Sequence, residues 1–228
     1  MTAPLPAQPG YFITFEGIDG CGKTTVVRFV EQQLRQRQIP VLVTREPGGT
    51  TIGNEIRQVL LKIGDRIMTP KTELLLYAAD RAQHVQERIL PALREGRVVL
   101  CDRYTDATRA YQGAGRGFDP AWIETLMAFA TDGLKPDLTI VLDLDVAQAQ
   151  QRLRERRERA GRPIHDRLDA EALEFHQRVR QAYLELARRE PERIKVVSAA
   201  GTVEETCQAA LEFVLDLLQV EGCGFSLS

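Results

Sequence analysis

Five short apolar runs alternate with longer amphipathic stretches along this chain of 228 residues, and that alternation restricts the fold more than any other feature. The runs are rich in β-branched residues, apolar on both faces, and bounded by glycine, proline or charge, as buried parallel strands are. They predict strands at Tyr11–Glu16, Val41–Thr44, Val98–Cys101, Leu138–Asp143 and Ile194–Ser198.

Between these runs the apolar residues recur at helical spacing, which predicts helices. The predicted helices are Lys23–Gln36, Thr51–Ile63, Lys71–Arg94, Asp119–Thr131, Val146–Arg157, Ala170–Arg189 and Val203–Gln219. Strand–helix alternation indicates an α/β fold in which a five-stranded parallel sheet carries helices on both faces. Ligands of such sheets collect at the carboxyl ends of the strands, so the functional residues are expected there.

Composition supports one globular unit without pointing to a large partner. Hydrophobic residues make up 43% of the chain and charged residues 27%, and we expect a single domain over residues 11–219, with a flexible lead-in at 1–10 and a loose tail at 220–228. A formal net charge of −2 does not favour binding to a nucleic acid polymer. The chain has neither an apolar run of ~18–20 residues that could span a membrane nor a secretion signal, and its four cysteines have no metal-ligand spacing, so we expect a cytoplasmic protein with reduced thiols.

Residues 17–24 fit the pattern G-x-x-x-x-G-K-[ST] between a predicted strand and a predicted helix. Glycines let the backbone turn its N–H groups toward phosphate oxygens, and the start of the helix adds a positive dipole. Lys23 is expected to bridge the β- and γ-phosphates, and the Thr24 hydroxyl to ligate Mg²⁺. The alternative is a chance glycine-rich turn. The motif predicts ATP or GTP binding by Gly17, Ile18, Asp19, Gly20, Cys21, Gly22, Lys23 and Thr24.

The second substrate is indicated by what surrounds this loop. The Asn-Lys-x-Asp segment by which GTPases read guanine is absent, and arginines near strand ends suit a phosphotransferase with an anionic acceptor. Asp102 and Arg103 follow a predicted strand and therefore lie beside the loop. A carboxylate there can hold Mg²⁺ through water, and a guanidinium can grip a phosphate at two points. The alternative is an ordinary surface ion pair.

In six segments, and over most of its length from Tyr11 to Gln219, the chain resembles the bacterial thymidylate kinases. The segments are Glu16–Thr25, Thr44–Thr50, Leu75–Arg81, Asp102–Tyr104, Ala110–Gly117 and Pro136–Leu142. The resemblance implies the three-layer P-loop NTPase fold and Mg²⁺-dependent transfer of the γ-phosphoryl group of ATP to dTMP. It also implies a homodimer, and it assigns Arg103 to the acceptor phosphate.

Two sets of side chains are candidates for binding the acceptor. Tyr77 and Arg81 lie four apart and share a helix face, so Tyr77 can stack on a pyrimidine while Arg81 reaches the base edge or the phosphate. Thr108, Tyr111 and Gln112 also share a face, and Gln112 carries the donor and acceptor that suit the imide edge of thymine. For Tyr77 the alternative is an aromatic residue packed in the core, and for Thr108, Tyr111 and Gln112 it is a plain solvent-facing helix.

The resemblance adds further roles. It places Asp19 at the acceptor's 3′-hydroxyl or a metal-bound water, Arg57 at the acceptor phosphate, and Tyr111 under the sugar, where it disfavours a 2′-hydroxyl. For Arg57 the alternative of an exposed helix arginine stays open. Whether the Glu46–Pro47 bond is cis is also open, because the sequence cannot show it.

The segment Arg152–Arg167 holds seven arginines and contains Gly161 and Pro163, which break it into a loop. One reading is a solvated helix face. The other is a lid at about residues 152–168, whose arginine stabilises the transferring phosphoryl group and excludes water. Position 20 is glycine, so the phosphate-binding loop has no catalytic arginine and the resemblance implies the lid. Arg154 and Arg157 are the candidates, joining Lys23, Arg103 and Asp19 as predicted catalytic residues.

Two other functions stay open. A kinase for another nucleoside monophosphate, or for a deoxynucleoside, would share the loop but need different base contacts. A nucleotide-binding regulatory module would bind ATP without transfer.

Overall fold

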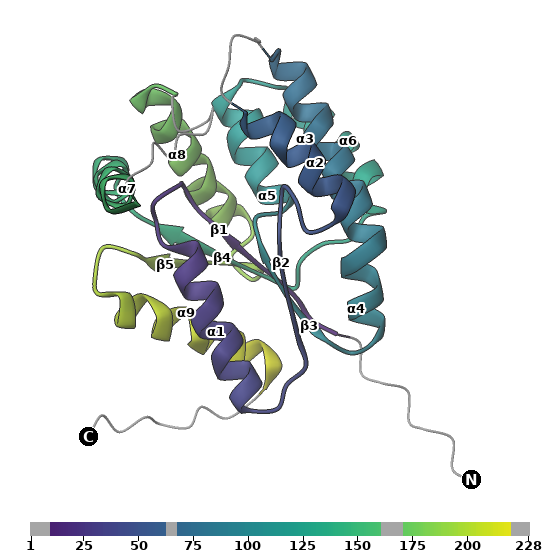
Figure 1. The fold of residues 1–228 in the computed structure, drawn as a ribbon, viewed down its shortest axis with the longest axis vertical. Coiled ribbons are helices and arrows are strands. Elements are labelled where there is room, and N and C mark those ends of the chain that lie inside the picture. Colours follow the sequence, from purple (N-terminus) through teal and green to yellow (C-terminus); the bar gives the residue numbers. More distant parts are fainter. Residues whose placement is uncertain (1–9, 63–67, 161–170, 220–228) are drawn as a thin grey trace.

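One parallel sheet, with strands in the order β2-β3-β1-β4-β5, organises the molecule (Figure 1). The structure is a computed structural model that describes residues 10–62, 68–160 and 171–219, without the side chains of residues 157 and 160. All five predicted strands are present, and each shifts by at most one residue at an end. They are β1 (Phe12–Glu16), β2 (Val41–Arg45), β3 (Val98–Asp102), β4 (Leu138–Asp143) and β5 (Ile194–Ser198).

The strand order creates a crevice beside β1. From β1 the chain first builds β2 and β3 on one side and then crosses to build β4 and β5 on the other. Such a reversal leaves a ligand crevice outside the carboxyl ends of the strands. β1 ends at Glu16, directly before the phosphate-binding loop, and β3 ends at Asp102, directly before Arg103. The sheet therefore brings together the two motifs that the sequence predicts to meet.

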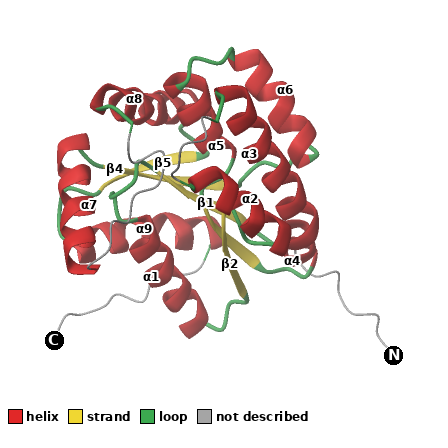
Figure 2. Cartoon of the chain, turned by 45° about the horizontal axis from the view of Figure 1, so that its top comes forward, coloured by secondary structure: helices red, strands yellow, loops and turns green. Residues whose placement is uncertain are grey.

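Helices cover the sheet on both sides, as Figure 2 shows. Helices α1 (Lys23–Gln36) and α9 (Val203–Leu218) lie below the sheet in that view, and α8 (Leu173–Arg189) lies above it. The side chains of β1 alternate accordingly: Ile13 packs in one apolar cluster with α1, and Phe12 in another with residues 85–92. Both-sided burial explains why the strands read as continuous apolar runs.

The predicted helix Lys71–Arg94 contains a π-helical turn. It comprises α3 (Pro70–His84), the π-helical turn η1 (Val85–Ile89) and α4 (Leu90–Arg94). Pro91 has no N–H, and its ring excludes the carbonyl four residues earlier, so the helical hydrogen bonds rearrange at this point. A second such pair, α5 (Thr105–Thr108) and η2 (Arg109–Gly115), holds the predicted face of Thr108, Tyr111 and Gln112.

The remaining helices are α2 (Thr51–Leu61), α6 (Pro120–Thr131) and α7 (Val146–Ala160). The predicted ends at positions 63 and 170 lie outside the described residues, as do the predicted tail, most of the lead-in, and the lid beyond residue 160. In the part of the chain that the structure describes, no helix has the length and apolar character required to cross a bilayer.

Candidate active site

The phosphate-binding loop adopts a backbone that requires glycine. Gly17 and Gly20 have φ of 129° and 86°, and a Cβ on Gly20 would lie 2.4 Å from the carbonyl oxygen of Ala149. Lys23 Nζ donates to the carbonyl oxygens of Gly17 at 3.0 Å and Ile18 at 3.1 Å, so the loop wraps around the ammonium group. Gly22 has no side chain to cap α1, and the start of that helix suits an anion.

A cavity of about 1220 Å³ opens in front of this loop and collects most of the predicted site residues. Predicted residues on its wall are Asp19, Gly20, Gly22, Lys23, Thr24, Arg57, Tyr77, Arg81, Asp102, Arg103, Thr108, Tyr111 and Gln112. Gly17, Ile18 and Cys21 are not on this wall, and the Cys21 thiol is buried. Residues that the sequence places up to 93 positions apart, such as Asp19 and Gln112, thus line one cavity.

Arg103 lines this cavity and forms an ion pair with the phosphate-binding loop. Its Nη2 donates to Asp19 Oδ1 at 2.8 Å, and its guanidinium lies 4.8 Å from the centroid of the Tyr111 ring. Burial by itself would lower the pKa of Arg103, but Asp19 raises it well above the ordinary value. Burial would raise the pKa of Asp19, but Arg103 and Lys23 lower it. Both groups are therefore charged at neutral pH, as a pair beside the phosphate-binding loop.

The backbone of Arg103 supports a functional role. Its φ of 73° lies in the left-handed region, which a residue with a long side chain seldom occupies. Such strain is concentrated at sites where the surrounding structure imposes it. Here the residue also donates to Tyr183 Oη at 3.4 Å and to the Gly17 carbonyl oxygen at 3.2 Å, contacts that hold the guanidinium against the loop.

The carboxyl group of Asp102 fits a predicted magnesium site. Its Oδ1 is buried and has no hydrogen-bond partner among the described residues. Asp102 and Thr24 line the same cavity. A carboxylate oxygen and a hydroxyl next to a phosphate-binding loop are the hard oxygen ligands that Mg²⁺ uses together with phosphate and water. The residues present therefore suit the ion that the sequence predicts.

The guanidinium of Arg81 makes several hydrogen bonds to the protein itself, which the sequence does not indicate. It is fully buried, and it donates to Glu46 Oε2 at 2.7 Å, Thr108 Oγ1 at 2.8 Å and the carbonyl oxygen of Tyr104 at 2.8 Å. Glu46 also binds His84, whose Nδ1 lies 2.9 Å from Oε1. Arg81 still lines the cavity, but these contacts tie its guanidinium to the protein.

The other predicted acceptor residues lie around Arg81. Tyr77 is partly buried on the cavity wall, and Gln112 is buried with its Nε2 donating to Glu73 Oε1 at 2.8 Å, which leaves its amide oxygen oriented by that bond. Tyr111 donates to Asp19 Oδ2 at 3.3 Å. Arg57 donates from Nη1 to the carbonyl oxygen of Pro47 at 2.8 Å, and the Glu46–Pro47 bond is cis.

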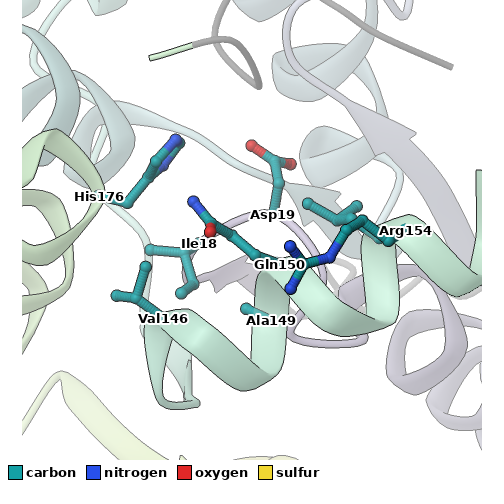
Figure 3. Close-up of a pocket in the computed structure, with 8 residues that line it drawn as sticks. Ile18, Asp19, Val146, Ala149, Gln150, Arg154 and His176 are labelled. Atoms are coloured by element: carbon teal, nitrogen blue, oxygen red, sulfur yellow. The ribbon is translucent and has the colours of Figure 1, made fainter. Parts of the chain in front are cut away.

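The arginines of α7 divide between two cavities. Arg152, Arg156 and Arg159 line the large cavity, whereas Arg154 lines a smaller one of about 170 Å³. Figure 3 shows Arg154 and Gln150 of α7 around this smaller opening, with Asp19 and His176 across from them. The side chain of Arg157 is not among those that the structure describes. Of the two predicted lid arginines, the structure thus places one, away from the large cavity.

Sequence reasoning missed several residues of the site. Glu46 belongs to a matched segment but received no role, although it carries the contacts of Arg81 and His84. Glu16 and Tyr183 were also missed, although Tyr183 donates to Glu16 Oε2 at 2.7 Å behind Arg103. A charged residue inside an otherwise apolar strand end was the available signal for Glu16. Tyr183 gave no signal beyond being aromatic.

A parallel sheet whose phosphate-binding loop faces an arginine-lined cavity defines a P-loop phosphotransferase. Comparison with known proteins narrows the class: the family model described as thymidylate kinase matches residues 15–210. The chain belongs to the thymidylate kinase family.

Individual relatives agree with the family model. The chain is 52% identical over 206 residues to the thymidylate kinase of Pelobacter propionicus, covering 90% of this chain and 94% of that one. It is 50% identical to the thymidylate kinase of Geobacter sulfurreducens, covering 91% and 97%. The crystal structure of thymidylate kinase from Ehrlichia chaffeensis matches with a TM-score of 0.72 at 31% identity, covering 93% and 100%. The predicted family, fold class and enzyme class are confirmed.

Proposed function

We propose that this protein transfers the γ-phosphoryl group of ATP to dTMP and releases ADP and dTDP. One observation carries the proposal: a single cavity holds Lys23 and Thr24 of the phosphate-binding loop together with Arg103, Tyr77 and Gln112, in a chain of this family. The loop supplies the donor side, and the other three supply a phosphate grip, a stacking ring and an amide for the acceptor.

The chemistry requires positioning more than proton transfer. The acceptor phosphate carries about −1.5 to −2 charge at pH 7, so its oxygen attacks without a general base. The protein's task is to align two anions and neutralise their charge. Lys23 binds the β- and γ-phosphates, and Arg103 binds the acceptor phosphate. Asp19 orients Arg103 and contacts the 3′-hydroxyl.

Around the acceptor, Arg57 adds a second cation for the phosphate, Tyr77 stacks on thymine, and Gln112 reads its imide edge. Tyr111 lies under the sugar. Arg81 holds the acceptor side of the cavity together through its bonds to Glu46 and Thr108. A guanidinium N–H that these bonds do not use reaches the base edge or the phosphate of the acceptor. A lid, predicted from the sequence at about residues 152–168, supplies an arginine for the transferring group, with Arg154 and Arg157 as the candidates from sequence.

Thr24 and Asp102 would hold Mg²⁺, supported by the unpaired Asp102 Oδ1. When bound, this ion neutralises charge on the β- and γ-phosphate oxygens. We further propose that the enzyme works in the cytoplasm as a homodimer of single-domain subunits, without a nucleic acid polymer as partner.

An acceptor panel tests the proposal. Purified protein is incubated with ATP and equal concentrations of dTMP, dCMP, UMP, dGMP or thymidine, and ADP and product are quantified with and without EDTA. We expect dTMP to have the highest kcat/KM, with kcat on the order of 1–100 s⁻¹, and EDTA to abolish turnover. Preference for dCMP, UMP or thymidine would reassign the acceptor, and ATP binding without transfer would indicate a regulatory module.

A further inference from the structure

Asp80, on α3, joins three elements behind the acceptor side of the cavity. Its side chain is fully buried, and its Oδ1 accepts a hydrogen bond from the backbone N–H of Gly48 at 2.8 Å. A Cβ on Gly53, in the first turn of α2, would lie 2.5 Å from the same oxygen, so α2 also packs directly on this carboxyl group. One buried group thus contacts α3, α2 and the loop of residues 46–50.

This arrangement is unfavourable for stability. Asp80 Oδ2 is buried and has no hydrogen-bond partner among the described residues. Burial, followed by the charge of Glu46, raises the pKa of Asp80 to about 7. The charged groups that act on it are Glu46 from the loop and Arg81 and His84 from its own helix, while the residue of α2 that packs on it is Gly53, which is uncharged. A residue that served packing alone would not need an ionisable group here.

The loop of residues 46–50 needs such an anchor. Gly48 and Gly49 have φ of 119° and 86°, and glycines can adopt many other conformations at little cost. Glu46 is held by Arg81 and His84, but these bonds fix only the start of the loop. In the middle of the loop, the Gly48 N–H donates to Asp80, next to the bond that the Pro47 carbonyl oxygen accepts from Arg57.

The loop in turn determines where a cation stands in the cavity. Arg57 Nη1 donates to the carbonyl oxygen of Pro47 at 2.8 Å, and Glu46, Pro47 and Arg57 all line the cavity. We propose that Asp80 is a positioning residue for the acceptor: by binding Gly48 it holds the loop of residues 46–50, and through Pro47 it holds Arg57 where the acceptor phosphate binds. The inference rests on the proposed dTMP kinase activity.

Steady-state kinetics with Asp80→Asn and Asp80→Ala test this role. Alanine removes the acceptor of the Gly48 N–H, so KM for dTMP should rise on the order of tenfold while KM for ATP stays unchanged. Asparagine keeps the oxygen that accepts this bond and should restore the KM for dTMP. If Asp80→Ala does not fold, Asp80→Ser replaces it, because a serine hydroxyl is too short to reach Gly48.

The matched control is Asp137→Ala. Asp137 Oδ2 also accepts a backbone N–H, that of Phe12 at 2.7 Å, but at the amino edge of the sheet, away from the cavity. This variant should lose thermal stability without any change in either KM.

Thermal melting adds a second readout. Because the pKa of Asp80 is raised on folding, its stabilising contribution is present at low pH and is lost as the pH rises through about 7. Asp80→Asn should therefore melt above the wild-type protein at pH 8, exceed it by less at pH 5, and come close to it only at about pH 4, near the ordinary pKa of 3.8.

The outcomes separate the two hypotheses. Absence of dTMP turnover in the wild-type protein would refute the proposed function before any variant is made. Turnover of dTMP with an unchanged KM in the Asp80→Ala or Asp80→Ser variant, an equal rise in KM for ATP, or an asparagine variant as weak as the alanine variant would refute the role of Asp80.

Discussion

Glu16 closes β1 directly before the phosphate-binding loop, and its carboxyl group is fully buried. The Tyr104 N–H donates to Oε1 at 2.7 Å, and the Tyr183 hydroxyl donates to Oε2 at 2.7 Å. Burial, and then the negative charge of Asp106, raise the pKa of Glu16 to about 7, although Arg103 lowers it. Both oxygens are hydrogen-bonded, so the raised pKa reflects loss of water around the charge and not a missing partner.

This raised pKa predicts a pH-dependent effect of Glu16→Gln on stability. The folded protein binds the Glu16 proton more tightly than the unfolded chain, so the contribution to stability is full below about pH 4.5 and is lost as the pH rises through about 7. Glutamine can keep both hydrogen bonds without the charge. The variant should exceed the wild-type free energy of unfolding by up to roughly 3 kcal/mol at pH 8.5, and by much less at pH 5, in urea titrations.

Glu205→Gln is the control. Glu205 is an exposed residue of the α9 capping box, where hydrogen bonds from the backbone and side chain of Thr202 lower its pKa. That variant should show no gain at high pH. A constant difference between Glu16→Gln and wild type across the pH range would contradict the assignment.

Individual residues were predictable where one short motif defines the geometry. Lys23 and Arg103 follow directly from a loop and a strand end, and both line the cavity. Arg81 was predicted only in part, because its main partner, Glu46, is 35 positions away. Helical spacing shows which residues share a face, but it does not show which polar group from another element reaches that face. The unpaired oxygens of Asp80 and Asp102 are invisible in sequence for the same reason.

At the scale of elements, α7 makes the lid hypothesis specific. Arg152 and Arg156 lie four apart and share a face with Arg159, three residues further on, and all three line the large cavity. Arg154 faces the smaller cavity (Figure 3). Arg152 already donates to the Ala199 carbonyl oxygen at 3.0 Å, and Arg159 lies 3.9 Å from Glu155. Because Arg154 lines the other cavity, Arg156 is the arginine of α7 that the geometry favours as the arginine finger.

Arg156→Ala should lower kcat for dTMP on the order of a hundredfold, below the full effect of an arginine finger because neighbouring arginines share the charge. Arg154→Ala should have the smaller effect of the two. Arg188→Ala, which removes an exposed α8 arginine paired with Glu185, controls for loss of positive charge and should leave kcat unchanged. Equal, small losses in kcat for Arg154→Ala and Arg156→Ala would argue against a lid arginine on α7.

Element boundaries show what patterns can predict. The five strands were found because apolar runs buried on both faces have few other interpretations. The start of α9 could also be predicted, since Thr202 and Glu205 form a capping box. The π-helical turns could not be predicted, because a shift of the backbone hydrogen bonds to i→i+5 changes the spacing of side chains without changing the composition. Pro91 was the one sequence signal for η1, and residues 109–115 carried none.

Large apolar side chains are exposed to solvent on three neighbouring helices, α2, α3 and α6. Leu75 on α3, Ile52 and Val59 on α2, and Trp122 and Phe129 on α6 are exposed, the last two at 71% and 83%. These three helices lie together in Figures 1 and 2. Exposed apolar residues on neighbouring helices are typical of an interface between proteins, and aromatic residues dominate the energy of such interfaces.

A homodimer formed through this patch predicts that Phe129→Asp gives a monomer in light scattering at micromolar concentration, whereas wild type and Leu173→Asp, a change at an exposed leucine on α8, stay dimeric. The melting temperature of the wild-type protein should also rise with concentration. A monomeric wild type would contradict the dimer, and a dimeric Phe129→Asp would contradict this surface.

A homodimer formed through these helices predicts a link between assembly and acceptor binding. α3 carries Tyr77 two positions from Leu75, and α2 carries Arg57 two positions from Val59. An interface that buries one face of α2 and α3 restrains the opposite face, which lines the acceptor side of the cavity. Monomeric Phe129→Asp should therefore bind dTMP more weakly while KM for ATP, set mainly by the phosphate-binding loop and α1, stays close to the wild-type value.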